Sequence, residues 1–207
     1  MNVFTYVIEH DLGFAPNPFH GVCTLACCKP RIRKKAELGD IVLGTGAALP
    51  KLRGYLTYWM QVDEITTFDA YWKDGRFRIK KPAMFGTTLY RYGDNIYHRD
   101  GQETYRQEYS FHSMEDGTVS QGDLQRDTGT TDKVLIGRQF AFWGKSGLLI
   151  PKHLSCFVRR ERHLFSEDQK HALMEWLGTH PERGYFDEPA HWQFLGRQKP
   201  KKVKKVA

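Results

Sequence analysis

Apolar runs in the first third and the middle of the chain predict β-strands. Residues Val3–Ile8 combine apolar, β-branched and aromatic side chains, which is typical of a strand. A second strand is expected at Ile41–Thr45, and Tyr55–Val62 is apolar at nearly every position. Such a continuous run is buried on both faces or forms the wall of a barrel. Two more strands are predicted at Lys133–Gly137 and Gln139–Gly144.

The clearest helical signal lies near the C-terminal end of the chain. Ser166 precedes an apolar-periodic segment and Gln169 follows three residues later, which is the pattern of a capping box. Gly178 then marks a helix end. The pattern predicts a helix over Glu167–Leu177 that packs one apolar face on the body. Thr67 is a candidate N-cap for a shorter helical turn.

The segment from Met84 to Thr131 differs in composition from the rest of the chain. Aromatic residues alternate there with glycine, aspartate and asparagine, and aliphatic residues are scarce. This composition is typical of a long functional loop with short strands. We therefore expect one α+β domain over residues 1–196, with a long inserted loop region and a C-terminal helix.

The net charge of +7 is concentrated at one end of the chain. Six basic residues and no acidic residue lie in segment 197–207: Arg197, Lys199, Lys201, Lys202, Lys204 and Lys205. The remaining chain is close to neutral, which does not fit a large duplex-binding face. We expect a disordered basic tail that strengthens binding to any polyanion.

The sequence shows no feature of a secreted or membrane protein. The first apolar stretch is interrupted early by Glu9, His10 and Asp11, and no apolar run approaches the roughly 20 residues that span a bilayer. We expect a cytoplasmic protein with reduced thiols and no membrane partner.

Thiols and cations are concentrated in the segment Cys23–Arg33, and three interpretations of the thiols remain open. The cysteines can simply pack in the core. A zinc site would need a second ligand pair that includes Cys156. Alternatively, Cys28 is a nucleophile, because neighbouring cations favour a thiolate, although no histidine is marked by the sequence as its base. We expect neither a metal nor a cofactor. The sequence also lacks a P-loop, the motif that cradles nucleotide phosphates.

Lys29, Arg31 and Arg33 occupy alternating positions directly after the cysteines. In an extended backbone these side chains would point the same way and converge on a phosphate group. The alternative is a solvated, charged turn. Spacing alone does not separate the two interpretations.

A second polar cluster lies in a glycine-bounded stretch and consists of Asp94, Asn95, Tyr97 and His98. These side chains could contact a base edge or supply a general acid and base, with Asp94 and His98 as the reactive pair. Such clusters also build turns, so a structural role stays open. Weaker polar candidates are His112 with Ser113, and Asp127 with Thr128.

Several short motifs together resemble one known family. The motifs are Asn17-Pro18-Phe19, Cys23–Arg33, Gly39-Asp40, Tyr71-Trp72, Lys81-Pro82, Tyr92–His98 and Asp127-Thr128. They resemble the nucleotide modification associated domain 2 family. That resemblance implies a bacterial or phage protein linked to base modification and defence systems.

A looser similarity concerns the fold. The basic loop, the Gly-Asp turn and the long apolar strand resemble the PUA, ASCH and EVE group of small barrels, which implies a PUA-like mixed β-barrel. It would also imply that Lys29, Arg31 and Arg33 hold phosphate. The stacking surface for a base would then come from one of the aromatic residues Tyr58, Trp59, Trp72, Tyr97 or Trp143.

Three functional hypotheses follow. The first is recognition of nucleic acid or of a modified nucleotide. The second is an enzyme of nucleotide or base modification that uses Cys28 or His98. The third is a subunit that recruits a base-modifying enzyme as its partner.

Overall fold

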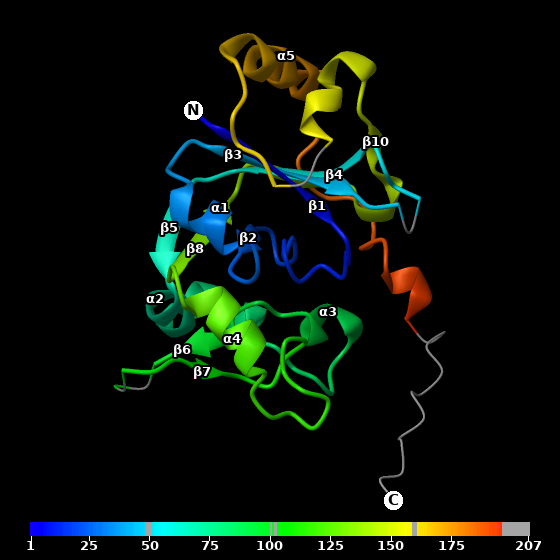
Figure 1. Cartoon of the computed structure of the whole chain (residues 1–207). Coiled ribbons are helices and arrows are strands. Elements are labelled where there is room, and N and C mark those ends of the chain that lie inside the picture. Colours follow the sequence, from blue (N-terminus) through cyan, green and yellow to red (C-terminus); the bar gives the residue numbers. More distant parts are fainter. Residues whose placement is uncertain (49–50, 100, 102, 159–160, 196–207) are drawn as a thin grey trace, which may run out of the picture.

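The strands of the chain form three sheets (Figure 1) in the computed structural model, which describes residues 1–48, 51–99, 101, 103–158 and 161–195. The large sheet has the order β1 (Val3–Ile8), β3 (Ile41–Gly46), β4 (Tyr55–Gln61), β9 (Phe140–Phe142) and β11 (Gly184–Tyr185), and β10 (Leu148–Leu149) also pairs with β4. The second sheet has the order β2 (Cys23–Leu25), β8 (Lys133–Gly137) and β5 (Glu64–Thr67). A hairpin of β6 (Tyr97–His98) and β7 (Arg106–Gln107) forms the third.

Short helices connect and cover these sheets. The α-helices are α1 (Pro30–Lys35), α2 (Phe68–Lys73), α3 (Thr88–Arg91), α4 (Gln121–Thr128) and α5 (Glu167–Gly178). The 3-10 helices are η1 (Gly75–Lys80), η2 (Gly144–Ser146), η3 (Lys152–Phe157) and η4 (Trp192–Phe194). None of the helices in the described part of the chain is long and apolar enough to cross a membrane.

The core is layered because strand side chains alternate between two faces. Val3 packs with Leu173 and Leu177 of α5 on one face of the large sheet, whereas Tyr6 packs on the other face toward the second sheet. The far face of the second sheet carries Ile136 and packs against α2 and the hairpin. Figure 1 shows this order, with α5 at the top and α2, α4 and the hairpin at the bottom.

Several sequence predictions are confirmed. The Ser166 hydroxyl accepts from the backbone N–H of Gln169, whose side chain in turn accepts from the backbone N–H of Ser166, so the capping box is complete. Thr67 caps α2 in the expected way. The five predicted strands correspond to β1, β3, β4, β8 and β9, and the class is α+β as predicted.

The predicted PUA-like barrel is not confirmed. Among the described residues, the large sheet begins at β1 and ends at β11, and these two strands do not pair with each other. The sheets therefore stack in open layers. The predicted basic tail, residues 197–207, lies outside the described residues.

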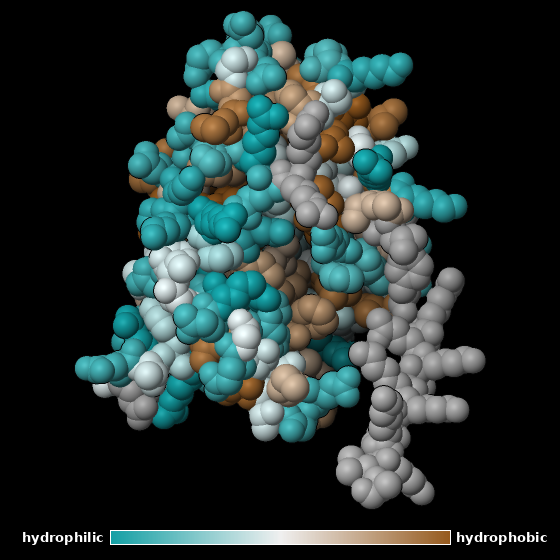
Figure 2. Space-filling view, in the orientation of Figure 1, coloured by the Kyte–Doolittle hydropathy of each residue, from teal (hydrophilic) through white to brown (hydrophobic). Residues whose placement is uncertain are grey.

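The segment predicted as a long loop is more structured than expected. It contains α3, β6, β7 and α4. This segment covers the lower face of the second sheet (Figure 1) and brings the end of α4 and His112 close to the cysteine segment. Hydrophilic side chains cover most of the face shown in Figure 2, and apolar residues are visible where the upper and lower layers meet.

Candidate functional site

Cys28 lies in a strained turn between β2 and α1. Its φ is 58° and that of Lys29 is 42°, so two consecutive non-glycine residues adopt the left-handed conformation. Each such residue costs on the order of 1 kcal/mol, and such strain is concentrated at functional sites. Two partly buried contacts hold the turn: the Cys28 N–H donates to Asp127 Oδ1 over 2.9 Å, and Arg33 Nε donates to the Cys28 carbonyl over 2.9 Å.

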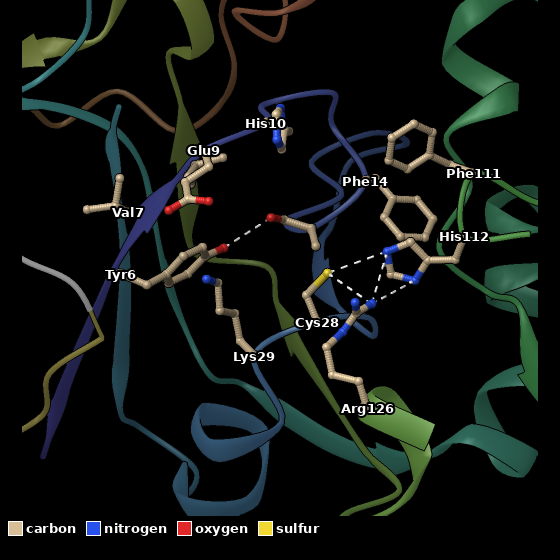
Figure 3. A pocket seen from close by; sticks show the side chains of 12 residues that line it. Tyr6, Val7, Glu9, His10, Phe14, Cys28, Lys29, Phe111, His112 and Arg126 are labelled. Carbon is tan, nitrogen blue, oxygen red and sulfur yellow. Dashed lines mark hydrogen bonds between the residues drawn. The ribbon is translucent and has the colours of Figure 1, made fainter. Parts of the chain in front are cut away.

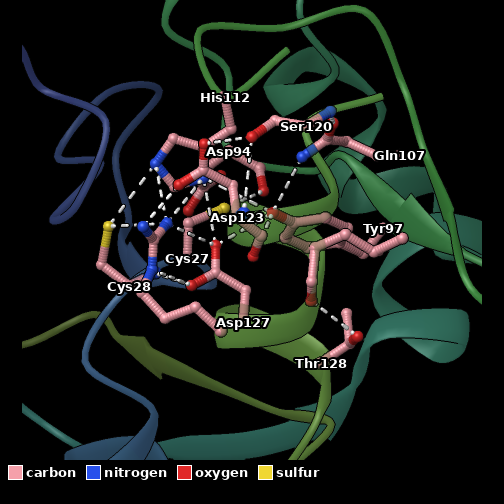
Figure 4. A network of polar contacts seen from close by, with 12 residues as sticks. Cys27, Cys28, Asp94, Tyr97, Gln107, His112, Ser120, Asp123, Asp127 and Thr128 are labelled. Carbon is pink, nitrogen blue, oxygen red and sulfur yellow. Dashed lines mark hydrogen bonds and ion pairs between the residues drawn. The ribbon is translucent and has the colours of Figure 1, made fainter. Parts of the chain in front are cut away.

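The Cys28 sulfur faces a histidine that is held by a carboxylate. Sγ lies 3.6 Å from His112 Nε2, and His112 Nδ1 lies 3.0 Å from Asp127 Oδ2 (Figure 4). Asp127 is fully buried. Cys28, His112 and Asp127 are thus arranged like the nucleophile, base and orienting carboxylate of covalent catalysts. In such catalysts the nucleophile and the base often lie further apart than an ordinary hydrogen bond until substrate binds.

Further side chains fix the positions of this triad. The Tyr97 hydroxyl donates to Asp127 Oδ2 over 2.9 Å, and Arg126 Nε donates to Asp127 Oδ1 over 3.0 Å. Phe14 packs edge-on against the His112 ring with centroids 4.5 Å apart. A triad whose orienting carboxylate is fully hydrogen-bonded keeps its imidazole in one orientation.

Electrostatics favour a charged histidine beside the sulfur. Burial lowers the pKa of His112, but hydrogen bonds and charge interactions with Asp127 and Cys28 outweigh it and raise the pKa to about 9. Burial raises the pKa of Asp127, whereas His112 and Arg126 hold it below its usual range. At neutral pH an imidazolium therefore faces the sulfur, an arrangement that activates nucleophilic thiols.

This charged pair predicts a dependence of stability on pH. The pKa of His112 lies near 6.5 in the unfolded chain and near 9 in the fold. The contribution of the charged His112 to the unfolding free energy is therefore complete below pH 6.5 and is lost between pH 6.5 and 9. At each pH, the unfolding free energy of wild type is compared with that of His112→Gln. The advantage of wild type over the variant should be about 3 kcal/mol larger at pH 6 than at pH 9.5. Urea unfolding at both pH values measures this, with the exposed His171→Gln as control. An equal difference at both pH values would contradict the assignment.

A pocket of about 360 Å³ opens beside the sulfur (Figure 3). Its walls come from the end of β1 and the residues that follow it, from Cys28 and Lys29, and from Phe111, His112 and Arg126. Phe111 is 44% exposed at the rim, and Lys29 Nζ lies 4.8 Å from the centroid of the Tyr6 ring. The guanidinium of Arg126 lies 3.9 Å from the Cys28 sulfur. The sulfur thus faces a hollow that offers both aromatic rings and cations.

Three ligand-type side chains at this site lie close enough together to hold a metal ion. The ligand atoms of Cys27, His112 and Asp127 are all within 4.8 Å of one another. Burial, however, raises the pKa of Cys27 well above its usual value, and its thiol donates to the Asp94 carbonyl over 3.4 Å. Arg126 already brings a cation to Asp127. The hydrogen bonding therefore fits a triad better than a metal centre.

The predicted catalytic residue Asp94 lies in a different, fully buried network. Its carboxylate accepts from the Thr24 hydroxyl over 2.6 Å and from the Tyr71 hydroxyl over 2.9 Å. Burial raises the pKa of Asp94, while the nearby Lys80 lowers it. Lys80 Nζ donates to Thr24 Oγ1 over 3.1 Å and to Asn17 Oδ1 over 2.7 Å. The network joins β2 to the segment after η1 from inside the core, and it does not line the pocket beside Cys28.

Asn95, His98 and Trp72 make structural contacts in the same region. The Asn95 amide donates to two backbone carbonyls, those of Tyr71 and Phe77. His98 donates to Glu108 over 2.7 Å and stacks on Trp72 with ring centroids 4.1 Å apart. The Trp72 ring is already in contact with His98, and Lys81 lies 3.3 Å from its centroid. Of the second predicted cluster, only Tyr97 reaches the triad.

The three alternating cations do not converge as expected. Residues 30–35 form α1, so the extended backbone that would align them is absent. Lys29 lines the pocket beside Cys28 and Arg31 lies exposed on α1. Arg33 is fully buried and donates to the carbonyls of Cys28, Asp127 and Lys133. Lys29, Arg31 and Arg33 therefore do not converge on one phosphate group.

Sequence reasoning named Cys28 but not its partner. His112 lies 84 residues further along the chain, and Asp127 lies 99 residues away. Both were only weak candidates, because no local pattern links them to a cysteine. The one sequence signal that pointed there was the unusual composition of the segment that contains them.

Comparison with known proteins adds one finding to this geometry. No curated protein and no solved structure matches the chain. Residues 1–196 match a family profile, and the chain therefore belongs to the nucleotide modification associated domain 2 family.

Proposed function

We propose that this protein is a cysteine-dependent enzyme that acts on a nucleotide in a base-modification process. The observation that carries the proposal is the Cys28–His112–Asp127 geometry at the wall of an open pocket. The family to which the chain belongs supplies the nucleotide context.

The reaction class that the triad supports best is acyl transfer or hydrolysis at a carbonyl carbon attached to a nucleotide. The Cys28 thiolate attacks the carbonyl carbon, a C–S bond forms, and His112 gives its proton to the leaving group as the carbon–leaving-group bond breaks. Water or an amine then attacks the thioester and gives a proton to His112. Cys28 leaves as thiolate, so every group returns to its starting state.

The pocket also supports the choice of substrate. Phe111 is 44% exposed and presents an aromatic ring on which a base can stack, and Lys29 and Arg126 supply positive charge for a phosphate. Its volume of about 360 Å³ lies in the usual range of small-molecule sites. A nucleotide meets both the aromatic and the cationic part of this lining.

Recognition without turnover is the second candidate function, since the same aromatic and cationic lining would bind a modified base. In that case nucleic acid is the partner, and a base-modifying enzyme is a further partner. Both candidates place the protein in a bacterial or phage modification or defence setting, in the cytoplasm.

A substrate panel tests the proposal and separates the two candidates. Wild type is incubated with nucleosides and oligonucleotides that carry acyl groups on base amino groups or sugar hydroxyls, and products are followed by mass spectrometry. We expect turnover that Cys28→Ser abolishes and Cys156→Ser leaves unchanged. Turnover retained by Cys28→Ser would refute the enzyme. Saturable binding with no turnover of any panel member would favour recognition.

A further inference from the structure

A second, smaller pocket lies beside α1 and is lined mainly by basic side chains. It has a volume of about 150 Å³, and its basic residues are Arg31, Lys35, Arg162 and His163. One acidic residue, Glu161, also lines it. A hollow of this size surrounded by cations suits a phosphate group better than a base.

The fold brings these cations together from two distant parts of the chain. Arg31 and Lys35 are four residues apart in α1 and therefore share one helix face. Arg162 is fixed next to β1, because its backbone exchanges two hydrogen bonds with Thr5. His163 stacks on the Phe4 ring with centroids 5.8 Å apart and lies 3.2 Å from Lys35 Nζ.

Arg31, Lys35 and Arg162 are not neutralised by carboxylates in the described part of the chain. Arg76, Arg99 and Arg138 all pair with carboxylates. By contrast, none of the ion pairs between described residues includes a basic residue of this pocket. Like charges at positions i and i+4 of a helix repel each other, so a bound anion would stabilise this face.

The basic pocket lies close to the pocket beside Cys28. Phe4 lines the former and Tyr6 lines the latter, and both belong to the same face of β1. Two residues along a strand span about 6.6 Å, so the two pockets are neighbours along β1. α1 also links the two pockets, since Lys29 precedes the helix and Arg31 lies in its first turn.

We propose that the pocket formed by Arg31, Lys35, Arg162 and His163 binds a backbone phosphate of a single-stranded polynucleotide whose neighbouring base enters the pocket beside Cys28. This proposal rests on the proposed function, and it specifies the substrate class as a polynucleotide. A single strand fits because a base must leave a duplex to reach a recessed sulfur.

Binding measurements with matched variants test this proposal. The full chain and the variant R31Q/K35Q/R162Q are titrated with a single-stranded oligonucleotide, with a mononucleotide and with inorganic phosphate, at several salt concentrations. Lys34→Gln is the control, since Lys34 lies on α1 but does not line the pocket. Protection of Cys28 from alkylation by the mononucleotide is recorded in parallel.

The triple variant should bind the oligonucleotide more weakly, with a salt dependence whose log–log slope is smaller by about 0.7, because one phosphate contact is lost. Its mononucleotide binding and Cys28 protection should match wild type. An unchanged oligonucleotide slope would overturn the phosphate pocket while leaving the proposed function intact. Binding of inorganic phosphate with no preference for the oligonucleotide over the mononucleotide would likewise overturn it. Absence of both protection and nucleotide binding would instead refute the proposed function.

Discussion

Replacing His112 with alanine should slow carbamidomethylation of Cys28 by iodoacetamide at pH 7 by about 10- to 100-fold. The reason is the imidazolium that faces the sulfur at 3.6 Å and is held by buried Asp127. Without that ring the Cys28 sulfur loses its contact with the imidazole and keeps the guanidinium of Arg126 at 3.9 Å. Mass spectrometry of the modified peptides gives the rate for each cysteine separately.

Two controls make this result specific. Cys156 is half-buried like Cys28, so its alkylation in the same sample reports any general loosening of the fold. His171→Ala removes an exposed histidine that pairs with Glu175 and should leave the Cys28 rate unchanged. If iodoacetamide alkylates Cys28 at the same rate in His112→Ala and in His171→Ala, His112 does not activate the thiol.

The second large effect concerns the buried network below the site. Lys80→Met should lower the unfolding free energy by about 3–5 kcal/mol, because it leaves the Asp94 carboxylate and the Asn17 oxygens buried without their cation. Burial already lowers the pKa of Lys80 to about 8, although Asp94 opposes this. Denaturant unfolding at pH 7 measures the difference.

The matched variant for this prediction is Lys73→Met, an exposed lysine on α2 that should change stability little. A double variant, K80M/D94N, should recover part of the loss, since no buried charge is then left without a partner. Equal stability of Lys80→Met and Lys73→Met would show that Lys80 and Asp94 do not support the fold.

Local patterns in the sequence predicted the regular elements well. The apolar period identified β1 and β4, and the cap of α5 could be read from Ser166 and Gln169. These features depend on neighbours within a few residues. Closure of a barrel depends on which strands pair across the whole chain, and the predicted PUA-like barrel is replaced by open sheets.

The candidate site was harder to predict because it is built from distant residues. Alternating cations fit a strand as well as a helix turn, and the structure has α1 at that position. Arg33 and Lys80 are completely buried, although arginine and lysine are usually exposed, so their structural roles could not be expected from residue type. Cys28 was recognisable by its neighbours in the sequence. His112 lies 84 residues further along the chain and meets Cys28 only in the folded protein.

The central claim is that Cys28 is a reactive thiol in a nucleotide-binding pocket. The most direct test is the rate of Cys28 alkylation by iodoacetamide at increasing nucleotide concentration. We predict that labelling of Cys28 slows saturably, while labelling of Cys156 in the same sample stays constant. A Cys28 rate that does not change up to millimolar nucleotide, or that falls together with the Cys156 rate, would contradict the account.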